Sequence, residues 1–230
     1  SIWTLKKSYY TENRQFSEIN IDALVVFLQE NFPIKVEIKD NVFKEFSLEN
    51  IKKLSNIRIT DIKSSFSEHK SSDDEIEFER KLCEDSSLMD STTKVENAQQ
   101  ISDVFMYDGF ELQKILRYLS EDSEILHIIL TNRLTCTFDE NDNRYHGRAV
   151  ICANPSIIST TGIVEAPAKP KEYYFEVMKL KTQGLDIKSA KEKYKGKFLE
   201  YNDKRLTKIL EGYILQVIFY NITGESFCED

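Results

Sequence analysis

Three side chains that could line a hydrolytic site lie close together in the second half of the sequence. His146 and Arg148 stand on either side of a glycine near the start of a predicted strand, and Glu165 follows the next predicted strand. Imidazole and carboxylate groups are typical of general acid–base catalysis. We therefore name His146, Arg148 and Glu165 as candidate catalytic residues of a hydrolase.

Polar residues that could bind a ligand fill the same stretch. They are Asn154, Thr160, Thr161 and Gly162. Functional residues often lie on loops that follow strands, which is why these four are candidate binding residues. The hydrolase hypothesis requires the three catalytic candidates and Asn154 to converge on one pocket. The alternative is that Arg148 pairs with an acid and His146 faces water.

A turn rich in Asp and Asn precedes this stretch, at residues 139–143. Asp139, Asn141 and Asn143 alternate as at the start of a calcium loop, but such a loop also needs Gly at its sixth position and Glu at its twelfth. His146 and Val150 stand at the eighth and twelfth positions here. Asp and Asn are common turn residues, so we predict a hairpin turn and no ion site.

The three histidines do not share the spacing of a metal site. His69 lies in a polar stretch, and His127 lies on an apolar strand, where a histidine is usually a hydrogen-bonded core residue. The sequence contains no H-E-x-x-H, no G-x-S-x-G and no glycine-rich phosphate loop. We predict no metal site and no cofactor, and zinc only if its ligands come from outside the usual motif.

The elements that position these residues alternate between strand and helix, which predicts an α/β fold. The predicted strands cover residues 2–5, 34–38, 57–62, 104–107, 125–130, 134–138, 148–152 and 155–159. The predicted helices cover residues 22–32, 43–54, 74–83, 109–119, 172–180, 187–198 and 203–222, with Ser47 as a possible interruption and 74–83 as an exposed, charged helix.

This order predicts a mixed sheet with helices on its faces, an edge hairpin and a helical C-terminal part. We assign residues 1–165 to an α/β sheet domain and residues 166–230 to the helical part of the same domain.

Composition excludes several classes of protein. A net charge of −8 argues against nucleic-acid binding, since proteins that bind nucleic acids need a basic surface. No run of 18 apolar residues and no signal peptide is found, so neither a membrane partner nor export is expected. The four cysteines, of which Cys136 and Cys152 lie on apolar strands, are widely spaced. Reduced thiols and a cytoplasmic location are therefore expected.

Charge is distributed unevenly along the chain. Residues 73–90 are acidic, whereas residues 169–208 are rich in lysine. This asymmetry favours another hypothesis beside the hydrolase, an interaction domain with a protein or peptide partner.

Three blocks carry a resemblance to a known family. They are NRYHGRAVIC at residues 143–152, NPSIISTTGIVEAPAKP at residues 154–170, and the tail at residues 212–230. These blocks resemble an archaeal family of metallopeptidase-like proteins. The order of elements resembles the metzincin zinc peptidases, and among them the archaemetzincins.

The archaemetzincin signature, H-E-x-x-H-x-x-G-x-x-H-C, holds zinc by three histidines and activates water by the glutamate. If Cys228 is placed on its final cysteine, the histidines fall on Val217, Asn221 and Phe227, and the glutamate falls on Ile218. The resemblance thus implies a metzincin-like fold without zinc catalysis, a pseudoenzyme that acts as a binding or regulatory module. It also implies that Val217, Ile218 and Phe219 are packed.

Overall fold

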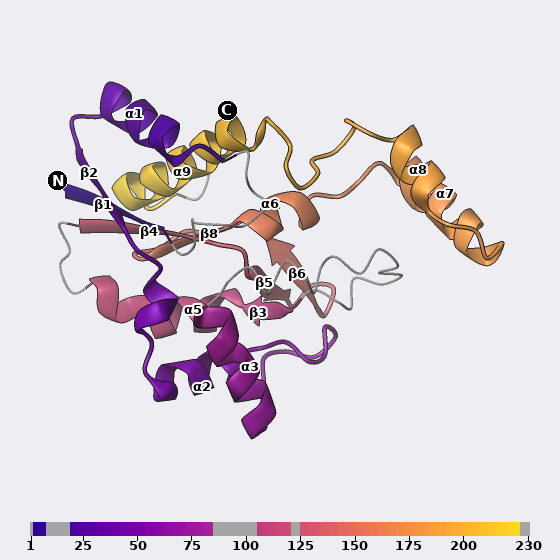
Figure 1. Cartoon of the computed structure of the whole chain (residues 1–230), viewed down its shortest axis with the longest axis horizontal. Coiled ribbons are helices and arrows are strands. Elements are labelled where there is room, and N and C mark those ends of the chain that lie inside the picture. Colours follow the sequence, from indigo (N-terminus) through magenta and orange to yellow (C-terminus); the bar gives the residue numbers. More distant parts are fainter. Residues whose placement is uncertain (1, 8–18, 85–104, 121–124, 226–230) are drawn as a thin grey trace.

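Two small sheets form the centre of the computed structural model, which describes residues 2–7, 19–84, 105–120 and 125–225. The larger sheet has the order β2-β1-β4-β8-β7 and the smaller has the order β3-β5-β6 (Figure 1). The larger sheet consists of β1 (Ile2–Lys7), β2 (Lys35–Lys39), β4 (Ile125–Thr131), β7 (Val150–Ile151) and β8 (Ser156–Ser159). The smaller consists of β3 (Met106–Asp108), β5 (Leu134–Asp139) and β6 (Arg144–Arg148).

Both sheets are mixed. β1 pairs in parallel with β2 and β4, β4 pairs in parallel with β8, and β7 is antiparallel to β8. In the smaller sheet β3 and β5 are parallel, while β5 and β6 form an antiparallel hairpin. The chain crosses from the larger sheet to the smaller for β3, and again for the β5–β6 hairpin. The predicted mixed sheet with an edge hairpin is therefore confirmed.

Helices cover the two faces of the larger sheet. α1 (Ile21–Asn31) and α9 (Leu206–Thr223) lie on one face, and α2 (Leu48–Asn56), α3 (Asp73–Glu84) and α5 (Gly109–Leu116) lie on the other (Figure 1). Along β4, Ile128 and Leu130 belong to the buried cluster that includes α1 and α9, and Ile129 belongs to the cluster that includes α2, α3 and α5. A strand buried on both faces is mostly apolar, which explains why Ile125, Leu126 and the run Ile128–Leu130 are apolar, with His127 and Thr131 as the polar positions of the strand.

The remaining helices follow β8. α6 (Thr160–Glu165) comes directly after that strand, and α7 (Lys171–Thr182) and α8 (Lys188–Lys193) follow. Two short 3-10 turns, Val42–Glu45 and Arg117–Ser120, complete the described elements. The helical C-terminal part is confirmed, whereas the division of the chain at residue 165 stays a prediction. None of the helices in the described ranges is long and apolar enough to cross a membrane.

Four local predictions were wrong. The predicted strand 148–152 is divided, because β6 of the hairpin ends at Arg148 and residues 150–151 form β7 in the larger sheet. The segment 57–62 forms only an isolated bridge, between Arg58 and Tyr107. α8 ends at Lys193, before the predicted end at residue 198. α3 is not simply exposed, because Glu79 and Leu82 are completely buried. Ser47 does interrupt the helical pattern, since its side chain accepts a hydrogen bond from the backbone of Asn50 and caps α2.

Candidate metal centre at the β5–β6 hairpin

The hairpin between β5 and β6 places polar side chains on one face of the smaller sheet. His146 pairs with Thr137, and Arg144 pairs with Asp139. Because side chains alternate between the faces of a strand and cross-strand partners share a face, Asp139, Thr137 and His146 lie on the same side. Asn143 has a φ of 52°, a conformation that Asn tolerates well, and it turns the chain back into β6. The predicted hairpin turn is confirmed.

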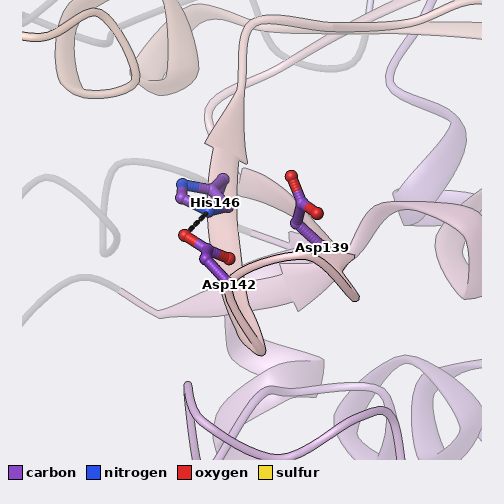
Figure 2. Close-up of side chains that lie close together, drawn as sticks. All are labelled: Asp139, Asp142 and His146. Carbon is purple, nitrogen blue, oxygen red and sulfur yellow. Dashed lines mark hydrogen bonds and ion pairs between the residues drawn. The ribbon is translucent and has the colours of Figure 1, made fainter.

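Asp139, Asp142 and His146 come together at the tip of this hairpin. One potential ligand atom from each lies within 4.8 Å of the others. His146 Nε2 is 2.7 Å from Asp142 Oδ2, and Figure 2 shows the Asp139 carboxylate beside this pair. The His146 side chain is 37% exposed and that of Asp142 is 46% exposed. The cluster is therefore open to solvent on one side.

The turn keeps Asp139 ionised. Its Oδ1 accepts hydrogen bonds from the backbone N–H and from Nδ2 of Asn141, both at 2.9 Å. The backbone hydrogen bond is the main reason why the pKa of the Asp139 carboxyl is lowered, and His146 and Arg148 add smaller electrostatic contributions. A metal ligand must be deprotonated, so this environment suits a cation ligand.

The donor set fits a divalent ion. Two carboxylates and one imidazole are ligand types that zinc and other divalent metals accept, and catalytic zinc sites use three protein ligands with an open position for water. The residues present therefore fit the chemistry of a metal centre. The sequence pattern had not grouped Asp142 with His146. The signal that could have found them is their spacing of four residues, with Asp142 inside the turn and His146 on the strand that leaves it.

The structure places Arg148 on the same face as His146, but Glu165 elsewhere. Arg148 Nε donates a hydrogen bond to Thr137 Oγ1 at 2.7 Å. Glu165 ends α6 and lies 3.5 Å from Lys169 Nζ. A Cβ on Gly147 would lie 3.4 Å from the Cβ of Ala166, so the end of α6 covers the face that Gly147 presents. By strand alternation, His146 and Arg148 point to the other face.

Asn154 precedes β8 in the chain, and its side chain contacts the backbone at the start of β4. Its Nδ2 donates to the carbonyl of Ile125 at 2.8 Å, and its Oδ1 accepts from the backbone N–H of His127 at 3.1 Å. α6 follows β8 at the opposite end of the same parallel strands. These contacts tie Asn154 to the sheet backbone, away from the hairpin.

Thr160, Thr161 and Gly162 form the buried beginning of α6. The hydroxyls of Thr160 and Thr161 donate to the carbonyls of Thr131 and Asn132, at 3.1 and 2.6 Å. Ser159 Oγ accepts from the backbone N–H of Gly162 at 2.8 Å. These bonds anchor α6 to the turn between the two sheets. A role for any of the predicted site residues in catalysis or ligand binding stays a prediction.

The positions aligned with the zinc signature fall on α9 and beyond it. Val217 and Ile218 are buried in the core between α9 and the larger sheet, and Phe219 is half-buried. Asn221 Nδ2 donates to the carbonyl of Val217 at 2.8 Å and to that of Ala153 at 3.3 Å. Phe227 and Cys228 lie outside the described residues.

Comparison with known proteins adds one result. Residues 4–230 match the family model described as "Probable metallopeptidase family (DUF6775)". No curated protein and no solved structure matches the chain. The match includes the whole β5–β6 hairpin and every candidate site residue.

Proposed function

Because the chain belongs to the probable metallopeptidase family, we propose that it keeps the fold of that family as a non-catalytic binding or regulatory module for a protein or peptide. On this proposal the chain is a pseudoenzyme related to archaeal, archaemetzincin-like peptidases. Peptide hydrolysis by such enzymes needs two histidines one helical turn apart to hold zinc, and a glutamate to activate the water.

The distribution of the histidines carries this proposal. His69 lies 3.0 Å from Glu75, His127 lies within β4, and His146 belongs to the hairpin, so the three are on separate elements. The aligned helix presents Val217 and Ile218 to the core instead of ligands to a metal. Apolar burial of this kind stabilises the fold but supplies no metal-binding atom.

Elemental analysis and peptidase assays of the purified chain test the proposal. We expect less than stoichiometric zinc after dialysis, and no cleavage of casein or of a quenched fluorescent peptide library with or without added zinc. Stoichiometric zinc together with cleavage that a chelator abolishes would overturn the binding-module proposal.

The cluster of Asp139, Asp142 and His146 favours a second candidate function, a metal-dependent hydrolase with its site on the hairpin. The three side chains are metal ligands that do not belong to an H-E-x-x-H motif. A divalent ion held there would polarise a bound water and lower its pKa to about 7. The three side chains would bind and orient the ion, and Arg148 would add positive charge on the same face.

Metal titration separates the two candidates. Calorimetric titration with zinc and with manganese would be compared for the wild type, His146→Gln, Asp142→Asn and the control Asp186→Asn, an exposed aspartate between α7 and α8. The hydrolase candidate predicts one ion per chain, loss of binding in the first two variants, and chelator-sensitive hydrolysis that His146→Gln abolishes. Equal binding by all four proteins would contradict a metal centre at this hairpin.

A further inference from the structure

α7 and α8 form a helical arm, residues 171–198, with a small core of its own. Tyr173 and Leu180 of α7 are buried with Ala190 and Tyr194. The Tyr173 ring centroid lies 5.8 Å from that of Tyr194, in an edge-to-face arrangement that aromatic pairs prefer. Figure 1 shows the two helices, in orange, extending away from the sheets. The arm is therefore held together by its own contacts.

The opposite face of α7 is apolar and exposed. Tyr174, Phe175 and Met178 are 49%, 60% and 64% exposed. Positions three and four apart share one face of a helix, so these side chains form one patch. Contiguous exposed apolar groups mark interaction sites, and aromatic residues and Met are enriched in protein interfaces.

Lysines flank this patch. Lys171 and Lys179 stand one turn before and one turn after Phe175, and Lys171 Nζ lies 5.8 Å from the Phe175 ring centroid. The arm contains eight lysines and four acidic residues, a net charge of +4, so the remainder of this chain of net charge −8 carries −12. The surface that fits the arm is thus acidic with an apolar centre.

The same chain carries an acidic helix and a partly apolar pocket away from the arm. α3 has six acidic and two basic residues, with Asp73 and Asp74 exposed at its start. α3 packs on α2, and a pocket of about 340 Å³ lies between α2 and α5. Ile57, Phe66 and Ile115 are its apolar lining residues, and Asn50, Lys53, Glu68, Glu111 and Lys114 complete the lining. The two lysines are paired with Glu49 and Glu111, at 2.7 and 2.6 Å. Figure 1 shows the arm and α3 well separated, so one copy does not bring the two surfaces together.

We propose that the chain forms a two-fold dimer in which the arm of each copy docks on the other copy. The patch of Tyr174, Phe175 and Met178 is buried against the α2–α5 pocket, and Lys171 and Lys179 face the acidic α3. A reciprocal exchange uses both arms and both pockets, so the assembly closes at two copies. The proposal is independent of the proposed function, since a binding module and an enzyme can both be dimers.

Sedimentation velocity and light scattering over a range of protein concentrations test the dimer. We expect a dimer at low ionic strength that dissociates more readily as salt is added, because the paired charges are screened. Phe175→Asp combined with Met178→Asp is expected to weaken association about tenfold or more. The control Val26→Asp, an exposed apolar position on α1, is expected to leave it unchanged.

A charge exchange tests which surface receives the arm. Lys171→Glu with Lys179→Glu, and separately Asp73→Lys with Asp74→Lys, should each weaken the homodimer. In a mixture of the two variants every arm meets an α3 of opposite charge, so heterodimers should form. Circular dichroism would establish that both variants are folded. A monomeric wild type, a dimer indifferent to the apolar substitutions, or a folded mixture without heterodimers would overturn the proposal.

Discussion

Arg133 and Glu79 form an ion pair in the interior of the protein, with Nη2 of Arg133 3.0 Å from Oε1 of Glu79. Neither residue is more than 1% exposed. Arg58 Nε donates to the second carboxylate oxygen of Glu79 at 2.8 Å, and the Tyr107 hydroxyl donates to the same oxygen at 2.9 Å. Burial raises the pKa of the Tyr107 phenol, which therefore stays protonated as a donor. One carboxylate thus links α3 to β3 and to the turn between β4 and β5.

Removing the charge of Glu79 should destabilise the fold strongly. Glu79→Gln leaves Arg58 and Arg133 buried without their counter-ion, and breaking a buried pair in this way costs about 3–5 kcal/mol. Glu77→Gln, on the exposed side of the same helix, removes only surface pairs with Arg80 and Lys81 and should cost about 0–1 kcal/mol. Urea denaturation of both variants measures the difference. Equal losses would show that the buried network does not stabilise the protein.

The contact between α6 and β6 makes Gly162 sensitive to the smallest enlargement. A Cβ at this position would lie 2.1 Å from the carbonyl oxygen of Arg148, so Gly162→Ala forces the backbone apart. We expect a loss of about 1–3 kcal/mol in the free energy of unfolding. Gly212 is the matched control, because a Cβ there meets no atom within 4 Å and it lies inside α9. Gly212→Ala should stabilise by about 0.5–1 kcal/mol.

The buried cysteines should react slowly with thiol reagents. Burial raises the pKa of the Cys83 thiol to about 11 and that of Cys136 to about 12, and it raises the pKa of half-buried Cys152 as well. The thiolate is the reactive form, so an increase of two pKa units lowers the reactive fraction about a hundredfold. In a Cys228→Ser background, a disulfide reagent at mildly alkaline pH should modify the native protein slowly and all three thiols once urea is added. Rapid modification of three thiols in the native state would contradict this burial.

The regular elements could be predicted where local pattern and tertiary burial agree. β4 is mostly apolar because both of its faces are covered, and Ser47 caps α2 as its side-chain chemistry favours. α6 was missed because Thr160, Thr161 and Gly162 are poor helix formers. Its start is held by hydrogen bonds to the β4–β5 turn, and no local sequence pattern reveals that turn.

The candidate site was predictable only in part. His146 and Arg148 were recognised as polar residues beside a strand, and the hairpin does place them on one face. Asp142 was assigned only to the turn, since its approach to His146 depends on how the four-residue turn folds back. The role of Glu79 could not be predicted either. The sequence of a charged helix does not indicate that one of its carboxylates contacts two buried arginines.

The start of α3 should make the free energy of unfolding depend on pH in the acidic range. Ser72 and Glu75 form a capping box, in which Glu75 Oε2 accepts from the backbone N–H of Ser72 at 2.8 Å and Ser72 Oγ accepts from the backbone N–H of Glu75 at 3.3 Å. His69 lies 3.0 Å from the other carboxylate oxygen. The backbone hydrogen bond from Ser72 is the main reason why the pKa of Glu75 falls from 4.5 to about 2.

A carboxyl whose pKa is lower in the folded state stabilises the fold fully above the unfolded value, and this stabilisation is lost as the pH falls through the folded value. The contribution of Glu75 is therefore complete above pH 4.5 and disappears between pH 4.5 and about 2. The free energy of unfolding of Glu75→Gln, measured in urea from pH 7 downward, should lie below that of the wild type and approach it across this window. Curves that stay parallel throughout the window would show that the capping carboxylate does not couple folding to protonation.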